Sequence, residues 1–209
     1  MLGQSAMTWW NPLTWDMTAV AQTVVSAGLG TAVVSGIITM VRNYRHRKDL
    51  GAYMGIRLAV NLESYALRCA NFCGENREAP HLPDEEFPYW NTSLPTLETY
   101  PEDAEGWRVL ERRLAAQCLN LPNEIAGAQG MIRSTAEYNT EDLGDELELR
   151  AATLGLKSWN LACALRGRYG FKKAELDWDF PEMLELSIND AKSAIEKRRQ
   201  SSAGAIDLD

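Results

Sequence analysis

An uncharged run near the amino terminus, residues 17–41, limits the possible folds of this chain more than any other feature. About 20 helical residues, each rising about 1.5 Å, cross the hydrocarbon core of a bilayer. The run is therefore long enough to span a membrane with some tilt. It predicts a transmembrane helix, which leaves residues 1–16 as a short segment outside the cytoplasm.

The two flanks of the run differ in charge. Three tryptophans precede it, and amphipathic rings of this kind prefer the lipid headgroup region. Four fixed positive charges follow it, and the positive flank of a membrane helix stays in the cytoplasm. We therefore predict an interfacial segment and a basic juxtamembrane cluster at residues 42–48, with the carboxyl-terminal part cytoplasmic. The predicted membrane-interface residues are Trp9, Trp10, Trp15, Arg42, Arg45, Arg47 and Lys48.

The run has two other interpretations besides a membrane span. A secretory signal peptide carries positive charge before its apolar part, but no basic residue precedes Arg42, and the run is longer than a typical signal sequence. A buried helix of a soluble protein is the second alternative. It stays open because the run includes Gln22, four threonines, two serines and three glycines.

Small residues recur every four positions in the run, at Gly28, Ala32 and Gly36. This spacing lets two helix backbones approach closely in lipid. It predicts a helix-association face and a homo-oligomer. The alternative is that weakly hydrophobic spans are rich in small residues by composition alone.

The net charge of the chain limits the kinds of partner that it can bind. The whole chain has a net charge of -8, and the part after residue 48 carries 28 acidic against 17 basic side chains. A nucleic-acid binder needs a basic surface to neutralise phosphates, so the composition argues against one. The predicted partners are the lipid bilayer, a second copy of the chain and an unidentified protein. The basic cluster 42–48 is interpreted as a topology signal, with recognition of anionic lipids as the alternative.

Helical spacing continues past the basic cluster to about Asn76. Six apolar residues follow one another at steps of three or four, as in helices that pack in bundles or coiled coils. These residues are Met54, Leu58, Leu62, Tyr65, Cys69 and Phe72. Gly51 and Gly55 are expected weak points, so continuity with the membrane helix is left open.

Residues 79–101 contain five prolines and four large aromatic side chains: Phe87, Tyr89, Trp90 and Tyr100. Because proline blocks helix formation, we predict a long crossover here. Long connections are often functional, which makes the aromatics a candidate interaction loop. The alternative is that their rings pack over the bundle.

Three more helices are predicted after the crossover. One begins at 101–103, has an apolar stripe through Trp107, Leu110 and Leu114, and is interrupted or kinked at Pro122. The next begins at 140–142 and ends at Gly170. The last opens at Pro181, and residues 201–209 form a flexible tail. Since no alternating strand pattern is present, the fold class is all-α, with a cytoplasmic bundle of about four helices over residues 49–200.

Cysteines and histidines are the main candidates for chemistry. Four cysteines in a chain of this length do not form a disulfide framework. Cys69, Cys73 and His81, with Cys118 and Cys163, are an alternative metal or catalytic set. However, metal-ligand spacing occurs once, inside a helix, and free cysteine is commonly buried in cores. Hydrolase motifs are absent, so we predict no catalytic residue, no metal and no cofactor.

Several stretches resemble a group of uncharacterised bacterial proteins. They are LNLPNEI at 119–125, LGL at 154–156, and Leu165-Arg166 with Arg168-Tyr169-Gly170. The similarity covers about residues 20–172. It implies a bacterial inner-membrane protein with one amino-terminal membrane helix and a helical cytoplasmic part, and it implies no activity.

These observations lead to one functional prediction and two alternatives. The prediction is a single-pass, membrane-anchored helical interaction protein (a scaffold, adaptor or regulator) that self-associates. The first alternative is a membrane-tethered enzyme or metal protein that uses the cysteine and histidine set. The second is a prophage or host-defence membrane factor.

Overall fold

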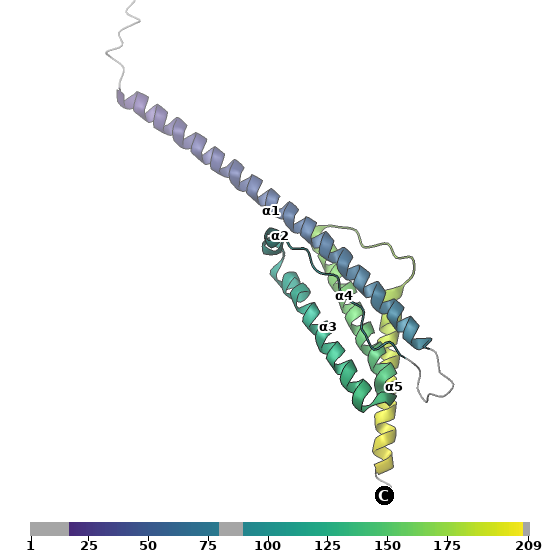
Figure 1. Cartoon of the computed structure of the whole chain (residues 1–209). Coiled ribbons are helices and arrows are strands. Elements are labelled where there is room, and N and C mark those ends of the chain that lie inside the picture. The colour runs from purple at the N-terminus through teal and green to yellow at the C-terminus, as the bar shows by residue number, and fades with distance from the viewer. Residues whose placement is uncertain (1–16, 80–89, 207–209) are drawn as a thin grey trace, which may run out of the picture. The chain divides into compact units, whose positions relative to one another are not determined.

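The computed structural model describes residues 17–79 and 90–206, with side chains described for 35–79 and 90–201 (Figure 1). It contains α1 (Met17–Arg77), α2 (Ala104–Val109), α3 (Arg112–Tyr138), a 3-10 turn (Thr140–Asp142), α4 (Leu143–Tyr169) and α5 (Phe180–Ile206). The described residues include no strand, so the all-α prediction is confirmed.

The chain divides into two units, Met1–Lys48 and Asp49–Asp209. Helix α1 contributes to both and has no break at Gly51 or Gly55. Within the described part of the chain, no helix combines the length and apolar character needed to cross a membrane.

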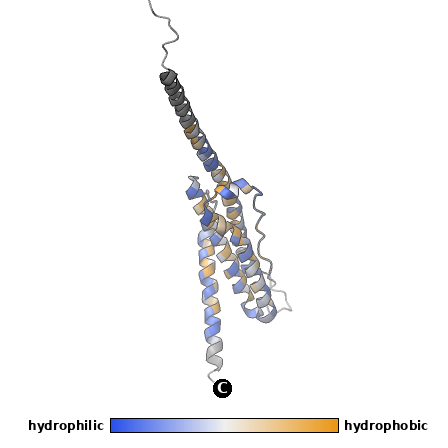
Figure 2. Ribbon diagram, turned by 90° about the vertical axis from the view of Figure 1, so that its left-hand side faces the viewer, coloured by the Kyte–Doolittle hydropathy of each residue, from blue (hydrophilic) through white to orange (hydrophobic). Residues whose placement is uncertain are grey.

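The unit Asp49–Asp209 is a helical bundle, as predicted. All six residues of the predicted α1 stripe are buried, from Met54 to Phe72. Hydrophobic and hydrophilic residues alternate along the helices (Figure 2). The periodicity therefore identified the packed face of α1 correctly, because i, i+3 and i+4 residues share one side of a helix.

Helix α4 packs against both α3 and α5. It also meets α1 closely at Gly155, where a β-carbon would lie 2.7 Å from Cys69 Cβ. Helix α4 ends as predicted at Gly170, whose φ of 76° is left-handed. Glycine adopts this conformation without steric cost.

The predicted helix after residue 101 is two helices, which corrects the sequence interpretation. Asp103 caps α2 by accepting from Gly106 N at 2.9 Å. The chain then leaves the helix at Leu110, where ψ is 151°, and α3 starts two residues later. Pro122 lies inside α3 and does not end it.

The described part of the crossover, from Trp90 to α2, lies on the bundle in extended form. Leu94 is buried, and its N–H donates to Gln129 Oε1 at 2.8 Å. Gln129 Nε2 donates in return to the carbonyl oxygen of Thr92 at 2.7 Å. Asn61 Nδ2 donates to the carbonyl oxygen of Glu98 at 3.2 Å. The side-chain amides of Asn61 and Gln129 thus form hydrogen bonds with a backbone segment that has no helical hydrogen bonds.

Helix α5 begins near the predicted position, with Asp179 Oδ1 accepting from Glu182 N at 3.2 Å. The helix extends to Ile206. It therefore includes most of the segment 201–209 that the sequence analysis described as a tail.

Candidate interaction groove

A groove of about 780 Å³ lies along the outer face of α4, between α3 and α5. Its floor is a row of α4 residues spaced three or four apart, while α3 and α5 provide the walls. Leu156, Leu161 and Ile188 give it an apolar base. The complete lining is Glu111, Arg113, Leu114, Gln117, Thr153, Leu156, Lys157, Asn160, Leu161, Ala164, Arg168 and Ile188.

Three cations border the groove. Lys157 Nζ lies 2.6 Å from Glu124 Oε1, and Arg168 Nε lies 2.6 Å from Glu111 Oε2. Arg113 is exposed and has no ionic partner among the described residues. Because Glu124 and Glu111 offset two of these cations, Arg113 gives the groove border one unpaired positive charge among the described residues. An apolar floor with a charged border is the chemistry of a surface that binds amphipathic partners.

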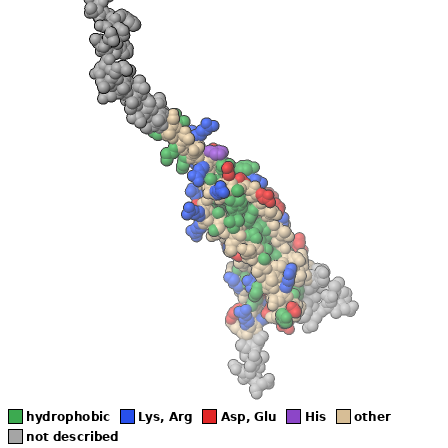
Figure 3. Space-filling model, turned by 60° about the vertical axis from the view of Figure 1, so that its left-hand side comes forward, with side chains coloured by type: hydrophobic (Ala, Val, Ile, Leu, Met, Phe, Trp, Pro, Cys, Tyr) green, Lys and Arg blue, Asp and Glu red, His purple; other side chains and the backbone are tan. Residues whose placement is uncertain are grey.

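The surface view shows a related combination on one side of the molecule. Hydrophobic side chains gather there next to Lys and Arg side chains (Figure 3). The exposed large hydrophobic residues of the bundle include Tyr53, Val60, Leu119, Met131 and Leu186. Apolar surface is therefore available for binding.

The predicted cysteine set is distributed through the bundle core. Cys69, Cys73 and Cys118 are buried and Cys163 is half-buried, all as free thiols. Burial raises the pKa of each buried thiol to about 12, so the thiols are neutral at physiological pH. His81 lies outside the described residues. Among those described, no three His, Cys, Asp or Glu side chains are arranged to hold a metal ion.

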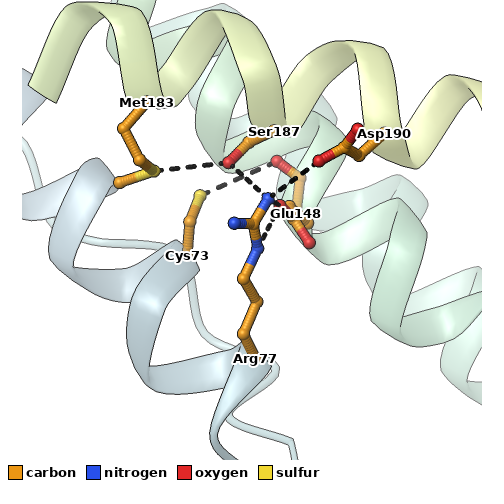
Figure 4. Close-up of polar contacts among 6 residues, drawn as sticks. All are labelled: Cys73, Arg77, Glu148, Met183, Ser187 and Asp190. Atoms are coloured by element: carbon orange, nitrogen blue, oxygen red, sulfur yellow. Dashed lines mark hydrogen bonds and ion pairs between the residues drawn. The ribbon is translucent and has the colours of Figure 1, made fainter.

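Cys73 borders a polar cluster that joins three helices (Figure 4). Arg77 of α1 donates from Nε to Glu148 Oε1 of α4 at 2.7 Å and from Nη2 to Ser187 Oγ of α5 at 3.0 Å. Asp190 Oδ2 lies 3.7 Å from the same Nη2. The hydrogen bond with Glu148 raises the pKa of the guanidinium. Because each group already has a partner, the cluster holds the end of α1 on the bundle.

The candidate interaction loop is only partly described. Trp90 is half-buried and lies against Gly144 of α4. Tyr100 is half-buried with its ring 5.8 Å from that of Trp107. Both side chains pack on the core of the bundle. Phe87 and Tyr89 lie outside the described residues.

The predicted membrane residues all fall in the unit Met1–Lys48. Trp9, Trp10 and Trp15 lie outside the described residues. Gly28 and Ala32 belong to α1, but their side chains lie outside the described set; Gly36 is exposed with open space around it. The side chains of Arg42, Arg45, Arg47 and Lys48 are all exposed.

The groove residues were missed by sequence reasoning. A signal was present, because Thr153, Asn160 and Ala164 share one face of α4 at helical spacing. No prediction covers that face, and Arg168 is named only in the resemblance. The neighbouring walls come from α3 and α5, which are far away in the sequence.

The fold and surface define the class of this protein as an all-helical bundle with an open, cation-bordered groove. Comparison of the chain with family models, curated proteins and solved structures finds no match.

Proposed function

We propose that this chain is a single-pass, membrane-anchored interaction protein of the bacterial inner membrane. Its amino terminus lies outside, and its helical bundle binds a partner protein in the cytoplasm. The observation that carries the binding role is the groove over α4. The sequence of residues 17–41, uncharged and followed by four basic side chains, supports the anchor.

The occupant we propose for the groove is an amphipathic helix with acidic side chains. The floor extends from Thr153 to Arg168, which corresponds to about 22 Å of helix. About 15 residues of a partner helix cover this length, with apolar residues against Leu156 and Ile188. Arg113, which has no ionic partner of its own among the described residues, is available to a carboxylate.

We expect the protein to sediment with membranes and to resist extraction by alkaline carbonate. Replacing Leu29 and Val33 together by arginine is expected to release it into the soluble fraction. Each arginine near the middle of a span costs about 3 kcal/mol for insertion. Asn43→Arg, just after the run, is the control and leaves the protein in the membrane. Wild-type protein in the carbonate supernatant would contradict the anchor.

We expect Ala164→Glu to abolish partner binding. Ala164 is an exposed floor residue, so the substitution puts a carboxylate among the cations and blocks the apolar base. Ala126→Glu is the matched control, because Ala126 is exposed on α3 and outside the groove. Substitutions at exposed helical sites of this kind cost little stability.

The measurement is crosslinking of tagged full-length protein in intact cells, followed by purification in mild detergent. Wild type and Ala126→Glu should recover a partner in stoichiometric amount, and Ala164→Glu at least tenfold less. A photo-crosslinking residue at Asn160 should then attach to an acidic amphipathic helix of that partner. Equal recovery by both alanine variants, or no partner with wild type, would show that the groove is not the binding site.

A further inference from the structure

A second surface of the bundle lies on α1, separate from the groove. Tyr53, Val60 and Leu67 are 57%, 52% and 37% exposed. They are spaced by seven residues, close to two helical turns, and therefore form one row along the helix. We call these three residues the α1 row. The buried stripe of α1, from Met54 to Phe72, points into the bundle core, so the row is an additional apolar face.

A pocket of about 470 Å³ adjoins the α1 row. Ile56, Arg57 and Val60 line it from α1, and Glu98 and Pro101 line it from the extended segment before α2. Val60 belongs to both features, so the row and the pocket form one continuous surface.

The polar groups of this pocket are incompletely used within the chain. The guanidinium of Arg57 lies over the ring of Tyr53, 5.6 Å from its centroid, and pairs with no carboxylate among the described residues. Asn61 Oδ1 is buried and accepts no hydrogen bond from a described residue. The carboxylate of Glu98 is mostly exposed, with Arg68 Nη2 at 3.0 Å. The surface of this pocket thus presents the Arg57 cation and the mostly exposed Glu98 carboxylate.

We propose that this face of α1 binds the same face of a second copy of the chain. A twofold interface needs a surface that is complementary to itself. Here the apolar row meets the apolar row, and Arg57 of each copy meets the exposed carboxylate of Glu98 of the other. A partner of uniform charge would attract only one of these two charged groups and repel the other.

The pairing is parallel, with equivalent residues of the two α1 helices at the same level. This orientation rests on the proposed membrane anchor, because two copies inserted in one membrane share the direction of α1. The contact between the two faces is independent of the α4 groove. It gives a location to the self-association that the sequence predicted only within residues 17–41.

Oxidative crosslinking of full-length protein tests the parallel pairing. The variant Val60→Cys is made together with Cys163→Ser, which removes the half-buried native thiol. Because a parallel twofold axis brings residue 60 near its equivalent, mild oxidation of membranes should give a disulfide-linked dimer. Leu119→Cys in the same background is the control, since Leu119 is an exposed residue of α3.

A dimer from Val60→Cys with little from Leu119→Cys supports the proposal. Equal dimer from both positions, or none from Val60→Cys, overturns it. If carbonate extraction shows that the anchor proposal fails, the same oxidation is done on the soluble fraction. Crosslinking at residue 60 there would retain the α1 contact, and its absence would reject the contact as well.

The polar match is tested with a charge reversal. Arg57→Glu in the Val60→Cys background places carboxylates against Glu98 of the other copy and should reduce the crosslinked fraction at least tenfold. Arg112→Glu is the control because Arg112 is exposed on α3 and outside the pocket. An unchanged dimer yield with Arg57→Glu, or an equal loss with Arg112→Glu, would reject the proposed contacts.

Discussion

Replacement of Glu63 by alanine is expected to lower the free energy of unfolding by about 3 kcal/mol. Glu63 of α1 and Arg166 of α4 form a two-point ion pair, with Nη2 and Oε2 2.8 Å apart. Their side chains are only 14% and 15% exposed. The loss of Glu63 leaves the guanidinium in a poorly solvated position, where its remaining partner is the carbonyl oxygen of Lys172 at 3.1 Å.

The exposed pair Arg168–Glu111 is the matched control for this prediction. Its side chains are 59% and 39% exposed, so Glu111→Ala should cost less than about 1 kcal/mol. The double variant Glu63→Leu, Arg166→Met should recover most of the stability, since it removes both charges together. Urea unfolding of the full chain in mild detergent, followed by far-UV circular dichroism, measures all three. Similar losses from Glu63→Ala and Glu111→Ala would contradict the role of burial.

The helices were predictable because their signals are local. The buried stripe of α1 follows from apolar residues at steps of three and four, and the end of α4 follows from Gly170. Both depend on backbone geometry within a few residues of the signal. The same reasoning predicted that the last helix opens at Pro181, one residue after the observed start of α5 at Phe180.

The break between α2 and α3 was missed because a distant residue supports it. The N–H of Glu111 donates to the hydroxyl oxygen of Tyr169, 3.1 Å away, at the end of α4. This hydrogen bond satisfies the backbone N–H of Glu111, which has no helical acceptor because of the break. Leu110 and Glu111 give no sequence signal for a helix break, because neither is glycine or proline. Pro122 gives such a signal, but it lies inside the continuous helix α3.

The candidate groove could not be derived from the sequence for a similar reason. Its floor residues were visible as one polar and small face of α4, but that face is a groove only where α3 and α5 stand on either side. The spacing of Cys69 and Cys73 was equally visible, and the structure gives it a packing role. Cys69 lies against Gly155, and Cys73 lies 3.8 Å from the carbonyl oxygen of Glu148.

Those buried thiols lead to the largest expected effect, a loss of stability in alkaline solution. Each of Cys69, Cys73 and Cys118 has its pKa raised from about 9.0 to about 12 by burial. Below pH 9 the thiols are protonated in both the folded and the unfolded chain, so their contribution is fully present. Between pH 9 and 12 the unfolded chain ionises first, and the free energy of unfolding falls as pH rises.

Raising the pH from 8 to 10.5 is expected to cost up to about 2 kcal/mol for each thiol and up to about 6 kcal/mol for the three. Tyr65 and Tyr100 act in the same direction above pH 10, because burial raises the pKa of each hydroxyl.

The measurement is urea unfolding at each pH under reducing conditions. The variant Cys118→Ala should be less stable at pH 8 because it leaves a cavity. In this variant, however, the part of the pH dependence that comes from the buried thiols should be about one third smaller than in wild type. Since the cavity cost is the same at every pH, only the slope reports thiol ionisation. An unchanged slope with all three cysteines replaced by alanine would assign the alkaline loss to other groups.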